Sequence, residues 1–182
     1  MALHSVFFWA LLLSSPSPSP PPSPSREPDP PIVSTADQIL SVAHASERPT
    51  VVHFWASWCE ACVRELSEMR QLQRSLKDLD APLLWISLDP PKDASKVGAF
   101  MRGHGLEARA LLLDAPDPAP VTSRFNPRWQ AELPATFVVL QSGVVAASHL
   151  GPTPIDVVLK EVRDLIRASR AGQPSPARRT KP

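Results

Sequence analysis

The hydrophobic positions of residues 32–171 follow two different spacings, which predict an alternation of strands and helices. Short runs rich in β-branched and aromatic residues predict buried strands at residues 50–55, 83–88 and 108–113. Apolar residues three or four positions apart predict amphipathic helices at 59–77, 93–102 and 155–169, with shorter helical segments at 35–45 and 121–125. Two further runs, 135–140 and 144–149, flank a polar turn and predict a hairpin.

This order of elements indicates the fold class. Strands that alternate with helices favour parallel pairing, because each helix carries the chain back to the start of the next strand. The closing hairpin adds antiparallel strands, and both faces of such a sheet need a covering layer. The sequence therefore predicts an α/β fold with a mixed central sheet flanked by helices on both faces.

The chain outside this region has a different composition. Residues 6–13 read VFFWALLL, which is too short to span a bilayer and resembles the apolar part of a secretory signal. Residues 14–31 hold nine of the 23 prolines and are typical of an extended Pro/Ser-rich linker. We therefore expect a signal or short hydrophobic segment at 1–13, a linker at 14–31, the folded domain at 32–171 and a disordered basic tail at 172–182. Export and a cytoplasmic location both stay open, with export favoured.

Charge and cysteine content exclude several classes of protein. Lys and Arg total 19 against 18 Asp and Glu, so no broad field favours nucleic acid or an anionic membrane. Any membrane contact would be made by the N-terminal segment. Two cysteines are too few for a disulfide-rich scaffold or a four-thiolate zinc site.

Both cysteines lie in one motif, Trp58-Cys59-Glu60-Ala61-Cys62, where a predicted strand leads into a predicted helix. Residues three apart on a helix lie about 5–6 Å apart on one face, which is within the range that a disulfide accepts. Near the helix start, free N–H groups and the helix dipole stabilise a thiolate at Cys59. This spacing predicts Cys59 as the attacking thiol and the deeper Cys62 as the resolving thiol. The Glu60 carboxylate disfavours that thiolate, which predicts a more reducing couple.

The segments VVHFWASWCEACVRE, SLD and LPATF followed by SGVV resemble the thioredoxin superfamily, and within it the TlpA/ResA-like extracytoplasmic thiol–disulfide oxidoreductases. The resemblance implies a thioredoxin fold and thiol–disulfide exchange with protein partners, first of all as a reductase, with a cytochrome c maturation-like role possible. It implies no cofactor beyond the Cys59–Cys62 disulfide, an upstream dithiol protein as electron donor, and a location outside the cytosol.

The resemblance also assigns residues to a substrate surface. Pro134 matches the cis-proline that faces the disulfide, and Leu133 would offer its backbone to an extended client segment. Trp58 would shield the thiol. Trp129 would either line the substrate groove or fill the edge of the core. Ala61 replaces the proline usual between the cysteines, which should change the redox potential without abolishing exchange.

Two further residues are candidates for moving protons. Glu65 matches an acid of the ResA-like group and lies one turn past Cys62, so it could take part in proton transfer, or it could pair with Arg64 or Arg70 on a solvated face. His53 stands where related proteins place a buried acid or Asn, and it could accept the proton of Cys62. The alternative is a histidine that is simply hydrogen-bonded in place.

A different class of function uses the same residues. Cys59, Cys62 and His53 together offer soft ligands, so a copper-handling module is the alternative to an oxidoreductase. A redox-inert interaction domain is a further possibility, although it has little need for paired thiols at a helix start.

Overall fold

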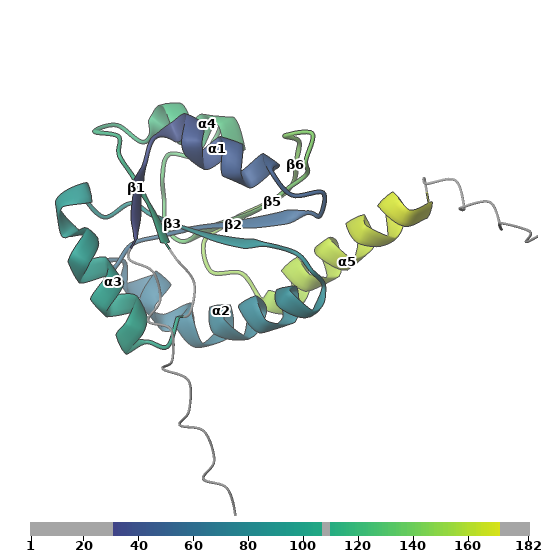
Figure 1. Cartoon of the computed structure of the whole chain (residues 1–182), viewed down its shortest axis with the longest axis horizontal. Coiled ribbons are helices and arrows are strands. Elements are labelled where there is room, and N and C mark those ends of the chain that lie inside the picture. The colour runs from purple at the N-terminus through teal and green to yellow at the C-terminus, as the bar shows by residue number, and fades with distance from the viewer. Residues whose placement is uncertain (1–30, 107–109, 172–182) are drawn as a thin grey trace, which may run out of the picture.

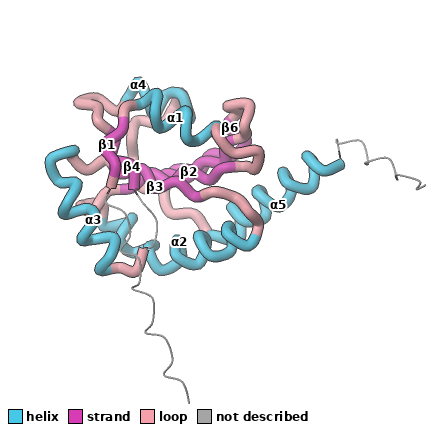
Figure 2. The backbone as a smooth tube through the Cα atoms, viewed as in Figure 1, coloured by secondary structure: helices cyan, strands magenta, loops and turns pink. Residues whose placement is uncertain are grey.

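The computed structural model describes residues 31–106 and 110–171 (Figure 1). The expected signal segment, almost all of the expected linker and the expected basic tail lie outside these residues. The described part forms three layers, with a central sheet between two layers of helices (Figure 2).

The sheet has six strands in the order β1-β4-β3-β2-β5-β6. The strands are β1 (Ile32–Ser34), β2 (Thr50–Trp55), β3 (Leu83–Ser87), β4 (Ala110–Leu113), β5 (Ala135–Val139) and β6 (Val145–Leu150). The first four in chain order pair in parallel, whereas β5 runs antiparallel to β2 and β6 runs antiparallel to β5. The mixed sheet that the sequence predicts is therefore confirmed.

Helices cover both faces of this sheet. The helical elements are α1 (Ala36–His44), α2 (Glu60–Asp78), the short 3-10 helix η1 (Pro91–Asp93), α3 (Ala94–Gly103), α4 (Ala119–Phe125) and α5 (Ile155–Ala171). Figure 1 shows α1 and α4 on one face and α2, α3 and α5 on the other. We refer to these as the α1/α4 face and the α2/α5 face.

The hydrophobic pattern predicted neither the short η1 nor the strand β1, and β1 is the larger omission because it belongs to the sheet. It is only three residues long, and two of them, Ile32 and Val33, are exposed. It pairs with β4 at the edge of the sheet. A short edge strand directly after a proline-rich run carries no alternation of buried and exposed positions, so the sequence gives no signal for it.

The two faces of the sheet bury two separate hydrophobic clusters. The α2/α5 face holds Trp55, Trp85 and the inner sides of α2 and α5. The α1/α4 face holds Phe54, Phe137 and Trp129. All six residues of β2 are buried, because this strand lies in the interior of the sheet with helices over both of its faces. The end of β2 is therefore a rigid support for whatever follows it.

Candidate active site

The two cysteines form a disulfide at the start of α2. The Cα atoms of Cys59 and Cys62 are 5.3 Å apart. Cys59 is the N-cap of the helix, which begins at Glu60, and the Cys59 sulfur accepts a hydrogen bond from the Cys62 backbone N–H at 3.2 Å. Cys62 has no exposed surface, as expected for the deeper sulfur. An N–H group aimed at the Cys59 sulfur would stabilise a thiolate there.

Pro134 directly precedes β5, at the end of the sheet where β2 leads toward the cysteines. The Leu133–Pro134 peptide bond is cis. Strand β5 begins at the next residue, Ala135, which pairs with Phe54 near the end of β2. The Pro134 carbonyl accepts a hydrogen bond from the Gly151 N–H at 2.8 Å. The antiparallel pairing of β5 with β2 thus brings residues far apart in the sequence to the end of the strand that leads to Cys59.

The tryptophans of the predicted substrate surface lie in different surroundings. Trp58 is 65 % exposed and immediately precedes Cys59. Trp129 is only 3 % exposed, its indole N–H donates to the Glu132 carbonyl at 2.8 Å, and its ring packs against Phe54. Of the two interpretations of Trp129, this position favours the one in which it fills the core.

The charged residue between the cysteines has a partner on the surface. Glu60 and Arg64 form an exposed ion pair one turn apart on α2. The guanidinium offsets part of the field that the Glu60 carboxylate exerts on the start of the helix. A solvent-exposed pair of this kind is screened and weak.

Glu65 does not lie on a solvated face, so of the two alternatives for this residue, the surface pair with Arg64 or Arg70 is wrong. Its residue surface is 8 % exposed, and Oε1 lies 3.5 Å from Nε2 of His53. His53 is 1 % exposed, and its Nδ1 is 3.0 Å from the Thr136 hydroxyl oxygen. Within the described residues, neither the Glu65 Oε1 nor the His53 Nε2 has a hydrogen bond of good geometry. The fold therefore brings together His53 and Glu65, two residues predicted separately.

Burial pushes both groups of this pair toward their neutral forms. Desolvation lowers the pKa of His53 to about 3. Desolvation, helped by the nearby Glu68 carboxylate, raises the pKa of Glu65 to about 7. A carboxyl group that titrates near neutral pH, one turn from Cys62, is suited to exchanging a proton with a thiol.

A third polar cluster fixes the loop before the cysteines. The buried Asp89 carboxylate accepts from the Ser57 N–H at 2.9 Å, from the Ser57 hydroxyl at 2.6 Å and from the Ser87 hydroxyl at 2.7 Å. Ser57 directly precedes the Trp58-Cys59 segment. The sequence pointed to Asp89 only as the last residue of the SLD segment and gave it no role, although an acid directly after a buried strand was the signal that could have drawn attention to it.

The comparisons with known proteins agree with this arrangement. The pattern of the AhpC/TSA family matches residues 28–148. The chain belongs to the AhpC/TSA family. It is 30 % identical over 154 residues to the thiol:disulfide interchange protein DsbE homolog of Paracoccus denitrificans, covering 79 % of this chain and 75 % of that protein. It is 24 % identical over 124 residues to the thioredoxin-like protein YneN of Bacillus subtilis, covering 68 % and 69 % of the two chains.

A solved structure supports the fold of this AhpC/TSA member. The exposed lipoprotein thioredoxin Etrx1 of Streptococcus pneumoniae superposes with a TM-score of 0.53 and 19 % identity, covering 71 % of this chain and 95 % of that one. The predicted thioredoxin fold is therefore confirmed. The family, the DsbE relatives and the spaced cysteine pair also confirm the predicted class, a protein thiol–disulfide oxidoreductase.

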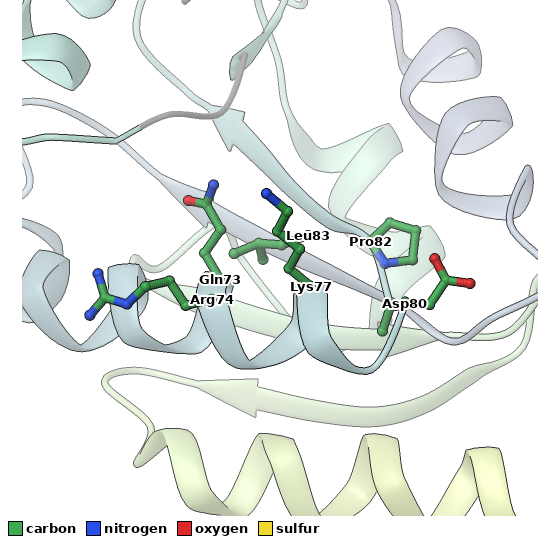
Figure 3. Close-up of a pocket in the computed structure, with 7 residues that line it drawn as sticks. Gln73, Arg74, Lys77, Asp80, Pro82 and Leu83 are labelled. Carbon is green, nitrogen blue, oxygen red and sulfur yellow. The ribbon is translucent and has the colours of Figure 1, made fainter. Parts of the chain in front are cut away.

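Other features of this AhpC/TSA member lie away from the cysteines. A groove of about 620 Å³ is lined by Gln73, Arg74, Lys77, Asp80, Ala81, Pro82 and Leu83 (Figure 3). It lies near the C-terminal end of α2, roughly 20–30 Å along the helix from Cys59 at 1.5 Å per residue. No group of three or more His, Cys, Asp or Glu side chains within 31–106 and 110–171 is placed to hold a metal ion, so the copper alternative gains no support. No helix in these ranges has both the length and the apolar character needed to cross a membrane.

Proposed function

We propose that this protein reduces disulfides of client proteins by exchange with the Cys59–Cys62 pair. The observation that carries the proposal is the placement of Cys59 at the N-cap of α2, with the Cys62 N–H aimed at its sulfur. Of the two cysteines, only Cys59 retains exposed surface, so it is the one that a client can reach.

The exchange proceeds in two steps. In the reduced protein the Cys59 thiolate attacks one sulfur of the client disulfide, forms a mixed disulfide and releases the other client sulfur as a thiolate. Cys62 then gives its proton to the Glu65 carboxylate and attacks the Cys59 sulfur. The second client sulfur leaves as a thiolate, and the Cys59–Cys62 disulfide forms. An upstream dithiol protein returns two electrons to the pair.

The surface around Cys59 is suited to holding an extended client segment. Trp58, the residue before Cys59, offers an exposed ring, and Leu133 precedes Pro134 just before the start of β5. The Leu133 backbone would bind the client as a short added strand.

We place the protein outside the cytosol. The resemblance of residues 6–13 to a secretory signal supports this location, as does similarity to a DsbE homolog and to an exposed lipoprotein thioredoxin. In that compartment electrons would come from another dithiol protein, and a cytochrome c maturation-like role fits the DsbE similarity. N-terminal sequencing of the protein from its native host tests the location.

The activity is tested by insulin reduction and by redox titration. The wild type should reduce insulin disulfides, Cys59→Ser should abolish this activity, and Cys62→Ser should accumulate mixed disulfides with the client. A reductase should have a midpoint potential closer to about −270 mV than to about −120 mV. A wild type that forms no mixed disulfide and transfers no electrons to insulin would refute the proposal.

A further inference from the structure

We propose that Thr136 fixes the tautomer of His53 so that its unprotonated Nε2 faces Glu65, and that this arrangement sets the pH range in which Cys62 can give up its proton. His53 and Thr136 are positioning residues in this view, because they act through Glu65. The inference rests on the proposed exchange reaction and concerns the control of its second step.

The register of the sheet brings the two positioning residues together. His53 of β2 pairs with Thr136 of β5, and their side chains meet on the α2/α5 face at 3.0 Å between Nδ1 and Oγ1. The His53 ring also packs against Trp85 in a T-shaped arrangement, with ring centroids 5.3 Å apart and planes at 81°. Held on two sides, the ring presents Nε2 to Glu65 Oε1 at 3.5 Å.

The side chains on the two sides of the ring, Thr136 and Glu65, decide which nitrogen carries the ring proton. A neutral imidazole has one N–H donor and one acceptor nitrogen. If Nδ1–H donates to the Thr136 hydroxyl, Nε2 is free to accept a hydrogen bond from a protonated Glu65. The opposite tautomer would direct an N–H at Glu65 and would favour a buried, ionised carboxylate, which is costly in this setting. Burial lowers the pKa of His53, so the ring is neutral, and raises the pKa of Glu65, so the carboxyl group can carry the proton that Nε2 would accept.

The other titratable groups around Glu65 do not replace this contact. Glu68 lies on the same helix, and its negative charge favours the protonated form of Glu65. His149 of β6 is opposite Thr136 in the sheet, but its Nε2 is 2.8 Å from Glu161 of α5. Cys59 and Cys62, at the start of α2, are the groups whose chemistry the pair serves.

The proton count of the resolving step is simple in this arrangement. Before the step Cys62 carries a thiol proton, Glu65 is ionised and His53 carries one ring proton. After the step the new disulfide carries none, Glu65 is protonated and His53 still carries one. The carboxyl O–H then donates to the His53 Nε2, so protonated Glu65 is stabilised by an acceptor already in place.

The test compares two substitutions at one position. Thr136→Val keeps the branched shape but removes the hydroxyl, so the ring proton should move to Nε2 and donate to the Glu65 carboxylate. The pH midpoint of mixed-disulfide resolution should then fall by about one unit, a tenfold change in proton concentration. Thr136→Ser keeps the hydroxyl, and its midpoint should match that of the wild type.

Two further measurements make the result decisive. In a Glu65→Gln background, Thr136→Val should no longer shift the midpoint, because the two residues act through one group. Nitrogen-15 NMR of the histidines in the unmodified protein should show His53 protonated on Nδ1, and this needs no variant to fold. Protonation on Nε2, or equal midpoints for Thr136→Val and Thr136→Ser, would overturn the inference while leaving the exchange activity intact. Loss of exchange in the wild type would instead contradict the proposed function.

Discussion

Neighbouring residues of one strand serve two different regions of this molecule. On the α1/α4 face, Phe54 is surrounded by aromatic rings, with centroids 5.0 Å from Phe125, 4.7 Å from Trp129 and 5.9 Å from Phe137. On the α2/α5 face, the adjacent His53 meets a hydroxyl and a carboxyl group. The first region is an apolar core. The second is a core that also contains three polar side chains in contact, Thr136, His53 and Glu65, which we call the polar row.

The contrast follows from the alternation of side chains along a strand. Residues of β2 point in turn to each face, so a single strand supplies both an apolar anchor and a buried titratable group. Apolar burial stabilises without direction, whereas buried polar groups destabilise unless each finds a partner. Apolar burial on both faces stabilises the fold, but the α2/α5 face loses some of that stability by burying His53 and Glu65 near the cysteine-bearing helix start.

The largest expected effect on stability comes from a substitution on the apolar α1/α4 face. Phe54→Ala should lower the free energy of unfolding by about 3–5 kcal/mol, because it removes a fully buried ring from a packed aromatic cluster. Denaturant unfolding measures this loss. The pH midpoint of disulfide exchange should not change in the protein that remains folded. A shifted midpoint would show that the two faces are not independent.

The loop before the cysteines should show an intermediate effect. Asp89→Ala removes the acceptor of three hydrogen bonds and leaves the Ser57 N–H without its partner, at a cost of about 2–3 kcal/mol. We also expect slower exchange, because the Trp58-Cys59 segment loses its support. Stopped-flow kinetics of insulin reduction, with the exposed Asp114→Ala as the control, measures this effect. Equal rates for the two variants would contradict the role assigned to Asp89.

The contrast between the faces also shows what the sequence could and could not predict. The buried strands, the amphipathic helices and the cysteine pair have local signals, and the structure contains all of them in the described range. The contact between His53 and Glu65 has no such signal, because it depends on how α2 lies across β2. The pairing of His53 with Thr136 depends on the register of strands 83 residues apart. For the same reason, the sequence did not decide whether Trp129 lines the substrate groove or fills the edge of the core, because its motif is compatible with both positions.

The polar face should also have its own signature in the pH dependence of stability. Between pH 3 and 6.5, the ordinary pKa of histidine, His53 binds fewer protons in the folded protein than in the unfolded chain. The free energy of unfolding therefore rises with pH in this range. Between pH 4.5, the ordinary pKa of glutamate, and pH 7, Glu65 binds more protons in the folded protein than in the unfolded chain. The free energy of unfolding therefore falls as the pH rises in this range. The two slopes oppose each other between pH 4.5 and 6.5. In Glu65→Gln only the His53 slope remains.

Denaturant unfolding at a series of pH values tests this signature. Relative to the wild type, Glu65→Gln should gain stability as the pH rises from 4.5 to 6.5, because the opposing slope of Glu65 is absent. Groups common to both proteins cancel in the difference. Phe54→Leu, on the apolar face, serves as the control and should shift the whole curve without changing its shape. Parallel curves for the wild type and Glu65→Gln would show that Glu65 titrates in its ordinary range.

The smallest expected effect concerns the exposed charges at the start of α2. Arg64→Ala leaves the Glu60 carboxylate without its partner, which should slow attack by Cys59 less than twofold because solvent screens both groups. Raising the ionic strength to 1 M should remove this difference, since the Debye length falls to about 3 Å. The midpoint shift of Thr136→Val should persist at the same salt concentration, because its groups are buried. If 1 M salt removed both the rate change of Arg64→Ala and the midpoint shift of Thr136→Val, the polar row would be open to solvent. The distinction between a buried proton site and a solvent-screened surface pair would then be wrong.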